Sequence, residues 1–193
     1  MTEKDPNIPP GWSYNPATWG QRMPIVGLAM LGFFVALYLA FYQLRVFPTV
    51  WEPFFGNGSK KILNSEVSNI LPIPDAALGA IGYLADAVAG VIGGVSRWRT
   101  MPWIVVVFGL AVGPLGFISI LLVVLQPVMF DAWCTLCLAS ALISVIMIGP
   151  AMDEFLASLQ HLKRVKASGR SVWKAFWGKD KPETKDYHVG TSN

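Results

Sequence analysis

Four long apolar stretches with almost no charge constrain this chain more than any other feature. Met23–Leu44, Pro102–Gln126 and Ala132–Met152 contain no Asp, Glu, Lys or Arg, and Ala76–Ser96 contains only Asp86. Each stretch is about as long as the roughly 20 residues that a helix needs to cross a bilayer. A core helix of a soluble protein seldom runs so long without a charge. The sequence therefore predicts an all-α integral membrane protein, a bundle of four transmembrane helices.

The composition is typical of a membrane protein and argues against several other classes. Hydrophobic residues make up 53% of the chain and charged residues only 14%, whereas roughly a quarter of the residues are charged in ordinary soluble domains. This composition excludes a disordered tail protein and disfavours a soluble enzyme. The net charge of +3 is too small to indicate binding to nucleic acid.

The positions of the positive charges predict the orientation in the membrane. Twelve of the 15 Lys and Arg residues lie in the N-terminal tail, between the second and third apolar stretches, or after the fourth stretch. Only Arg45, Lys60 and Lys61 lie between the first and second stretches. Because cytoplasmic segments carry an excess of Lys and Arg, both termini are expected in the cytoplasm. The expected regions are a cytoplasmic tail (1–22), a four-helix membrane domain (23–152), and a basic cytoplasmic C-terminal helix and tail (153–193).

On the outer side this orientation leaves a long first loop, Arg45–Pro74. Loops longer than about 12–15 residues usually have a function of their own. A short helix is expected within Lys60–Ile70, before Pro72 and Pro74 stop it, and an aromatic segment that includes Phe54 precedes this helix. The aromatic segment lies either in the membrane interface, where aromatic residues gather, or over a lipid-soluble ligand as a lid.

Both cysteines of the chain lie in one motif, Cys134-Thr-Leu-Cys137. The motif falls where the second outer loop turns into the fourth apolar stretch, so both thiols are expected on the first turn of a transmembrane helix. Free N–H groups and the helix dipole favour anions there and lower the pKa of a thiol. The motif therefore predicts a pair that exchanges thiols and disulfides. Cys134 is nearer the helix end and is expected to be more accessible than Cys137, which lies one turn deeper.

Other interpretations of the pair have different consequences. Two cysteines in a membrane helix are also small apolar residues that pack well. A zinc site needs more ligands, and the two histidines, His161 and His188, fall on the opposite side of the membrane. No metal is therefore expected, nor a haem held by two histidines. A pair that cycles needs an electron acceptor, and the acceptor that fits a lipid phase is a quinone.

Three segments together resemble a known family. They are the Cys134–Cys137 motif that opens the fourth apolar stretch, the run Lys61-Ile-Leu-Asn-Ser-Glu-Val-Ser, and Ile73-Pro-Asp-Ala-Ala-Leu-Gly79, which leads into the second stretch. In this order and spacing they resemble the bacterial vitamin K epoxide reductase family, over about Met23 to Pro150. The combination is specific, whereas a lone CxxC motif would not be.

The resemblance implies a four-helix bundle that holds a quinone, ubiquinone or menaquinone, near the outer surface of a bacterial inner membrane. It implies that Cys137 faces the quinone and that Cys134 exchanges with a thiol carrier, for which a periplasmic thioredoxin-like dithiol protein is expected. The first loop would cap the quinone. The residues expected to contact the quinone are Phe54, Leu63, Asp75 and Ala141.

This chain departs from the family pattern at several positions. A second cysteine pair normally lies in the first loop, and its positions fall near Trp51 and Ser59 here. Asp75 replaces an expected Asn, and Ala141 replaces a Tyr that is often found one turn beyond the motif. Two functions follow as alternatives. The first is a quinone-linked thiol–disulfide oxidoreductase, and the second is a catalytically degenerate accessory subunit that packs with other subunits in a larger membrane complex.

Asp86 is a charged residue in the middle of the second apolar stretch. A carboxylate there costs a few kcal/mol, and Asp86 shares a helical face with glycines, so it should point into the bundle or at a partner chain. Its expected role is a hydrogen bond to Ser119, Ser144 or another subunit. The alternative is a role in proton handling.

Overall fold

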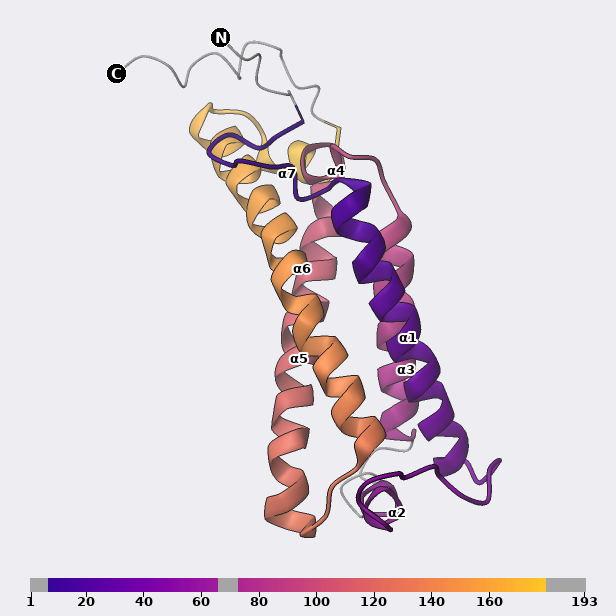
Figure 1. The fold of residues 1–193 in the computed structure, drawn as a ribbon. Coiled ribbons are helices and arrows are strands. Elements are labelled where there is room, and N and C mark those ends of the chain that lie inside the picture. The colour runs from indigo at the N-terminus through magenta and orange to yellow at the C-terminus, as the bar shows by residue number, and fades with distance from the viewer. Residues whose placement is uncertain (1–6, 66–72, 180–193) are drawn as a thin grey trace.

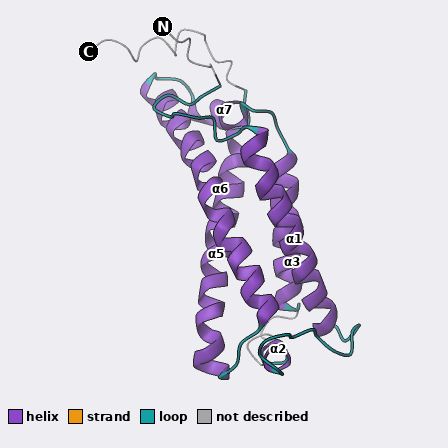
Figure 2. Ribbon diagram, in the orientation of Figure 1, coloured by secondary structure: helices purple, strands orange, loops and turns teal. Residues whose placement is uncertain are grey.

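The computed structural model describes residues 7–65 and 73–179 of the chain. Within these ranges all regular structure is helical, which confirms the all-α part of the expected fold class (Figure 2). The long helices are α1 (Trp19–Gln43), α3 (Asp75–Val91), α5 (Pro102–Phe130) and α6 (Thr135–Ala167). The short helices are α2 (Gly58–Leu63), α4 (Arg97–Thr100) and α7 (Val172–Phe176).

Three of the four expected spans are confirmed as helices that are long and apolar enough to cross a membrane. They are α1 with 25 residues, α5 with 29 and α6 with 33. The remaining expected span, 76–96, is shorter in the structure, because α3 has 17 residues and ends at Val91. At about 1.5 Å per residue, α3 covers roughly 26 Å, slightly less than the ~30 Å hydrocarbon core of a bilayer. The described residues thus form an all-helical membrane protein with three strong spans and one shorter helix.

The connecting segments differ in part from expectation. The loop helix α2 starts two residues before the expected Lys60 and ends at Leu63, while positions 66–70 of the expected helix lie outside the described residues. Beyond residue 152, where a helical extension is expected, α6 continues without a break to Ala167. The chain then turns at Gly169, whose φ of +73° suits a residue without a Cβ atom, before α7 begins.

The four long helices form an elongated bundle (Figure 1). α1 packs along α3, and α5 packs along α6, while α1 also contacts α6 and α3 contacts α5 more lightly. α2 and the beginning of α6 lie together at one end of the bundle, and α4 and α7 lie at the other end (Figure 1). The first loop and the cysteine motif therefore share one end, as expected.

Small residues allow a tyrosine to cross the inside of the bundle. Tyr83 of α3 is 6% exposed, and its ring occupies the space beside Gly32 of α1, where a Cβ atom would lie 2.5 Å from the ring. The Tyr83 hydroxyl donates to the carbonyl oxygen of Ser140 at 2.6 Å and lies 2.7 Å from the Ser144 hydroxyl. Tyr83 thus links α3 to α6 across α1.

Replacing Gly32 by alanine should therefore destabilise the bundle. In an open helical position Gly→Ala adds stability, by up to about 1 kcal/mol. At Gly32 the new methyl group collides with the Tyr83 ring, so we expect a loss of about 1–3 kcal/mol, measured as thermal unfolding in detergent. Gly27 lies on the same helix with nothing within 4 Å of its Cβ position, and Gly27→Ala is the matched control. Equal stability of the two variants would contradict this packing.

Two buried arginines bind the carbonyl groups at the C-terminal end of α3. Arg22 and Arg97 are each 1% exposed. Arg22 donates to the carbonyl oxygens of Gly90 and Ile92 at 2.9 and 2.8 Å, and Arg97 donates to that of Ile92 at 2.8 Å. Glu154 of α6, 2% exposed, accepts two hydrogen bonds from the Arg97 guanidinium. The last carbonyls of a helix have no partner within the helix, so these side chains supply the missing bonds where α3 ends.

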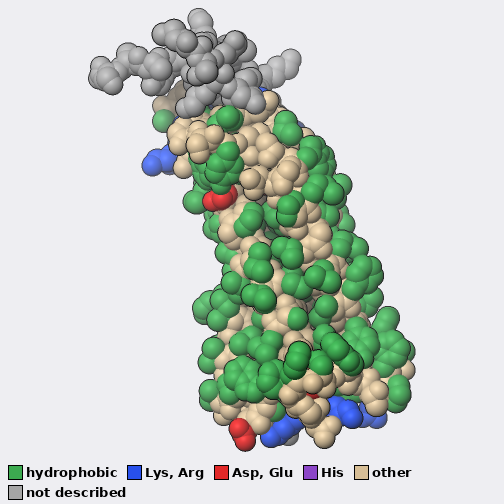
Figure 3. Space-filling model, in the orientation of Figure 1, with side chains coloured by type: hydrophobic (Ala, Val, Ile, Leu, Met, Phe, Trp, Pro, Cys, Tyr) green, Lys and Arg blue, Asp and Glu red, His purple; other side chains and the backbone are tan. Residues whose placement is uncertain are grey.

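Apolar side chains cover the outside of the bundle. In the view of Figure 3, hydrophobic side chains run along its length, and the Lys, Arg, Asp and Glu side chains that can be seen lie near its two ends. Leu31, Phe34 and Phe117 are each more than half exposed. Exposed apolar surface of this extent marks contact with a membrane or with another protein.

Asp86 points into the bundle, as expected, and is 6% exposed. It borders a small cavity together with Tyr83 and Ser144. The expected hydrogen bond to Ser119 or Ser144 is not formed within the described residues. Ser119 donates to the carbonyl oxygen of Leu115, and the Ser144 hydroxyl pairs with Tyr83.

Candidate functional site

The two cysteines form a disulfide at the start of α6. Cys134 is the residue that precedes the helix, and Cys137 lies on its first turn, as expected from the sequence. Their Cα atoms are 5.2 Å apart. The Cys137 N–H donates to Cys134 Sγ at 3.1 Å, so the free N–H groups of this helix end already point at sulfur. This arrangement can open and close as a dithiol–disulfide pair.

The expectation that Cys134 is the more accessible cysteine is wrong for this structure. Cys134 is 0% exposed, whereas Cys137 is only partly buried. Two neighbours enclose Cys134: Gln126 of α5 accepts a hydrogen bond from its N–H at 3.0 Å, and Gly58 of α2 packs directly against the carbonyl group of Trp133. Proximity to the helix end did not predict exposure, because the first loop folds back over that end.

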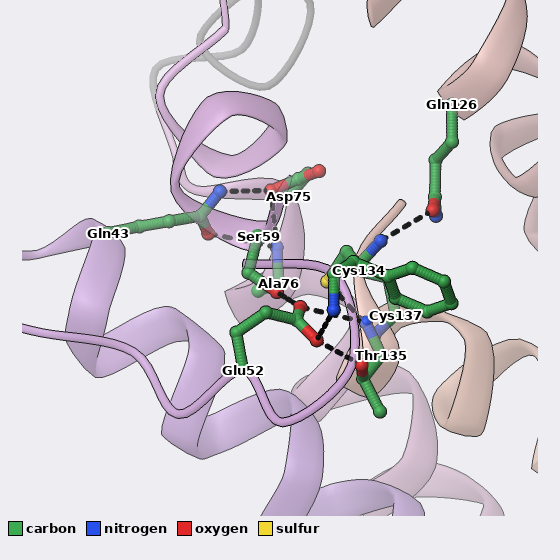
Figure 4. Close-up of a disulfide and its surroundings, with 10 residues drawn as sticks. Gln43, Glu52, Ser59, Asp75, Ala76, Gln126, Cys134, Thr135 and Cys137 are labelled. Carbon is green, nitrogen blue, oxygen red and sulfur yellow. Dashed lines mark hydrogen bonds between the residues drawn. A yellow bond between two sulfur atoms is a disulfide. The ribbon is translucent and has the colours of Figure 1, made fainter. Parts of the chain in front are cut away.

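A carboxylate that the sequence analysis did not single out lies at the centre of the site. Glu52 of the first loop accepts hydrogen bonds from the Ser59 hydroxyl, from the Thr135 hydroxyl, and from the Thr135 N–H at 3.0 Å. The N–H groups of Phe54 and Phe55 add two longer contacts, at 3.4 and 3.3 Å. Figure 4 shows the Glu52 carboxylate between α2 and the first turn of α6.

These hydrogen bonds keep Glu52 ionised. Burial alone would raise the pKa of its carboxyl group, but the hydrogen bonds from Ser59 and Thr135 outweigh burial and lower this pKa to about 2. Glu52 is therefore a fixed negative charge beside the disulfide at every ordinary pH. One feature of the sequence could have identified Glu52. It is an acidic residue at the start of the aromatic segment that acts as a lid in one of the two interpretations above.

Two residues expected to contact a quinone, Leu63 and Asp75, lie at the same end of the bundle. Leu63 is 4% exposed and belongs to a cluster against which Cys137 packs. Asp75 begins α3, where it accepts hydrogen bonds from the Gln43 side chain and, at 2.8 Å, from the Ala76 N–H. Figure 4 shows that Gln43, Asp75 and the disulfide lie near one another.

The other two expected contacts lie apart from each other. Phe54 is 76% exposed, and its ring packs edge to face against Phe55. Ala141, which is 8% exposed, lines an apolar groove of about 260 Å³ between α5 and α6. The remaining lining residues are Ile120, Val123, Val124, Leu138, Leu142 and Val145.

This groove fits a lipid-soluble ring better than a polar substrate. Its lining is purely aliphatic, and it extends along α6 from Leu138, the residue after Cys137. Several of its walls, including Leu142 at 61% and Val124 at 54%, are exposed, so the groove opens sideways to the surroundings of the bundle. A hydrophobic molecule dissolved in the bilayer would reach it without crossing water.

Replacing Gly58 by alanine should loosen the cover over Cys134. A Cβ atom at Gly58 would lie 1.9 Å from the carbonyl oxygen of Trp133, and backbone cannot yield as a flexible side chain does. We expect α2 to shift and the Cys134–Cys137 disulfide to be reduced several-fold faster by a water-soluble phosphine. Lys61→Ala, at an exposed position of the same helix, should leave the rate unchanged. Equal rates in both variants would show that α2 does not limit access.

The sequence model of the vitamin K epoxide reductase family matches residues 23–151. This range begins within α1 and ends within α6, so it includes Glu52, the disulfide and the whole of α3 and α5. A search of curated proteins found no match to the chain.

Proposed function

Because this chain belongs to the vitamin K epoxide reductase family, we propose that it is a membrane thiol–disulfide oxidoreductase that passes electrons from a partner dithiol to a quinone. The observation that carries the proposal is the Cys134–Cys137 disulfide at the start of α6, one residue from the apolar groove. The family implies a four-helix membrane bundle, with α3 as the fourth span. The excess of Lys and Arg at the opposite end supports a cytoplasmic location for that end and an outward-facing disulfide in a bacterial inner membrane.

The first half of the reaction is an exchange with the partner. A thiolate of the dithiol protein attacks Sγ of Cys134, the Cys134–Cys137 bond breaks, and Cys137 leaves as a thiolate. The second thiol of the partner then attacks the mixed disulfide, which releases Cys134 as a thiol and leaves the partner oxidised. Two electrons and two protons have then moved to this chain. Because Cys134 is buried, the first loop must move before the attack.

The second half returns the pair to the disulfide. A quinone, when bound, supplies an acceptor for two electrons and two protons. We propose that Ala141 and its neighbours in the groove hold the ring and tail, and that Leu63, Phe54 and Asp75 complete the cover and the polar rim. Leu63 packs against the Cys137 region and excludes water from it. Cys137 is the cysteine nearer the groove and is therefore the one assigned to face the acceptor.

The state of the pair in native membranes tests this proposal. Thiols are alkylated with a mass-shifting maleimide while the quinone pool is held oxidised by oxygen or reduced by blocking the terminal oxidases. We expect the pair to be mostly oxidised in the first case and mostly reduced in the second. Treatment with dithiothreitol before alkylation controls for thiols that the reagent does not reach.

The alternative function is a catalytically degenerate accessory subunit of a larger membrane complex. The complete burial of Cys134 and the absence of cysteine at Trp51 and Ser59 favour it. In that case the disulfide is a structural staple, and the pair stays oxidised whatever the state of the quinone pool. The alkylation experiment separates the two functions, and proteins that purify with the chain would identify the complex.

A further inference from the structure

The Glu52 carboxylate lies at the N-terminal end of α6, where negative charge is favoured. The N-terminus of a helix attracts anions through its free N–H groups and its dipole. In α6 the first of these N–H groups, that of Thr135, donates to Glu52 at 3.0 Å. Cys134, the adjacent residue, has its sulfur at the same helix end. One helix end is thus shared by a carboxylate and a thiol.

The proximity of the Glu52 carboxylate and the Cys134 sulfur has an electrostatic consequence when the disulfide is reduced. A cysteine at a helix N-terminus ordinarily has a lowered pKa, because the helix stabilises its thiolate. Here a second negative charge lies within the same first turn, in a partly buried environment where charges are poorly screened. Repulsion between the two anions disfavours the Cys134 thiolate and makes the reduced pair less stable than it would be without Glu52.

We propose that Glu52 sets the reduction potential of the Cys134–Cys137 pair and couples it to the position of the first loop. With the loop closed, Glu52 disfavours the reduced pair and makes it a stronger electron donor. When a partner displaces the loop, Glu52 leaves the helix end, and the pair becomes easier to reduce. The loop therefore favours electron uptake when open and electron release when closed.

The contacts of the first loop indicate that Glu52 and α2 move together. Ser59 of α2 donates its hydroxyl hydrogen to Glu52 and is 0% exposed, so Glu52 holds α2 and α6 together. Gly58, the neighbour of Ser59, packs on Trp133. Displacing α2 from Trp133 therefore also breaks the contact between Glu52 and Thr135. The biological role of this coupling rests on the proposed function. The effect of Glu52 on the reduction potential does not, because it is a property of the Cys134–Cys137 pair itself.

The test is a redox titration of the purified full-length chain in lipid nanodiscs. The chain is equilibrated in dithiothreitol buffers of graded ratio, and the oxidised fraction is read by mass-shift alkylation. Glu52→Gln removes the charge and keeps the shape of the side chain. We expect the redox equilibrium to shift about tenfold towards the reduced pair, which corresponds to a midpoint potential about 30 mV less negative. Glu52→Asp keeps the charge and should restore most of the wild-type potential.

Asp131 provides the matched control for removal of a charge. It lies three residues before Cys134 and is exposed, and its φ of +43° is a conformation that Asn tolerates well. Asp131→Asn should leave the midpoint unchanged. An unchanged midpoint in Glu52→Gln, or an equal shift in Asp131→Asn, would overturn the proposal.

A second measurement needs no variant. In the reduced wild-type chain, the pH profile of alkylation should give a Cys134 thiol pKa near or above the ordinary value of about 8.5, despite the helix end. A pKa of about 7 or lower would overturn the proposal, since it would show that the carboxylate does not oppose the thiolate. Neither measurement uses a quinone or a partner protein. If Glu52 changes the reduction potential but the pair never reduces a quinone, the proposed function is refuted and the role of Glu52 stands.

Discussion

Replacing either cysteine of the Cys134–Cys137 pair by serine is expected to abolish transfer of electrons from a dithiol protein to a quinone, and the two variants should fail in different ways. In Cys134→Ser the attacking thiolate finds no disulfide, because Cys137 is then the single cysteine of the chain and has no second cysteine with which to form one. In Cys137→Ser the Cys134 thiolate can still attack the disulfide of the oxidised partner, which breaks the S–S bond of the partner and releases one of its cysteines as a thiolate, but no Cys137 remains to displace the partner from Cys134. This variant should therefore accumulate a mixed disulfide, visible as a heavier band on a non-reducing gel.

The two variants also separate exchange from quinone binding. Since Leu138 and Ala141 form the groove, Cys134→Ser should bind a quinone analogue with nearly wild-type affinity, measured by quenching of tryptophan fluorescence. Full oxidation of the partner by Cys134→Ser would refute the assigned roles and favour the accessory-subunit function. A Cys134→Ser variant that no longer binds the analogue would place the ligand elsewhere in the chain.

Replacing Glu154 by alanine is expected to destabilise the bundle by about 3–5 kcal/mol, because it leaves the buried Arg97 guanidinium without its counter-charge. Arg97 and Glu154 are 1% and 2% exposed and form an ion pair, and Arg97 also supports the end of α3 through Ile92. The measurement is thermal or denaturant unfolding in detergent. We expect α3 to be the first helix to exchange its amide hydrogens in this variant.

Asp153, the neighbour of Glu154, is the matched control. Its carboxylate accepts a hydrogen bond from Tyr14 at an exposed position, and exposed polar pairs contribute about 0–1 kcal/mol. Asp153→Asn should therefore unfold close to the wild-type temperature. A Glu154→Ala variant as stable as Asp153→Asn would show that the buried pair does not hold the end of α3.

The helices could be predicted from the sequence because their cause is local. Runs of more than about 20 residues without charge are longer than the strands of ordinary sheets, and a helix satisfies all its backbone hydrogen bonds within one segment, as a segment in lipid requires. The position of Cys134 and Cys137 at the start of α6 followed from the same pattern. The end of α3 did not follow, because it depends on the arginine side chains that bind its last carbonyl groups and on Gly93, whose φ of +85° turns the chain just after the helix, and composition does not show these features.

The residues missed by sequence reasoning all act over long separations in the chain. Arg22 and Arg97 served only as indicators of orientation, although Arg22 binds the carbonyl oxygen of Gly90, 68 positions away, and Arg97 pairs with Glu154, 57 positions away. Glu52 contacts Thr135, 83 positions away, and that contact explains why Cys134 is buried although it lies at a helix end. Such pairings depend on how the first loop folds over the bundle, and a single sequence contains no pattern that predicts that path.

The proposed transfer of electrons from the Cys134–Cys137 pair to a quinone is a claim that can be tested by direct measurement of quinol formation. The purified chain in lipid nanodiscs is reduced, freed of reductant, and mixed with an excess of ubiquinone or menaquinone while quinol absorbance and free thiols are followed together. We predict that each chain forms one quinol as both of its thiols disappear, and that Cys137→Ser forms none. Thiols that persist beside excess oxidised quinone would contradict the claim.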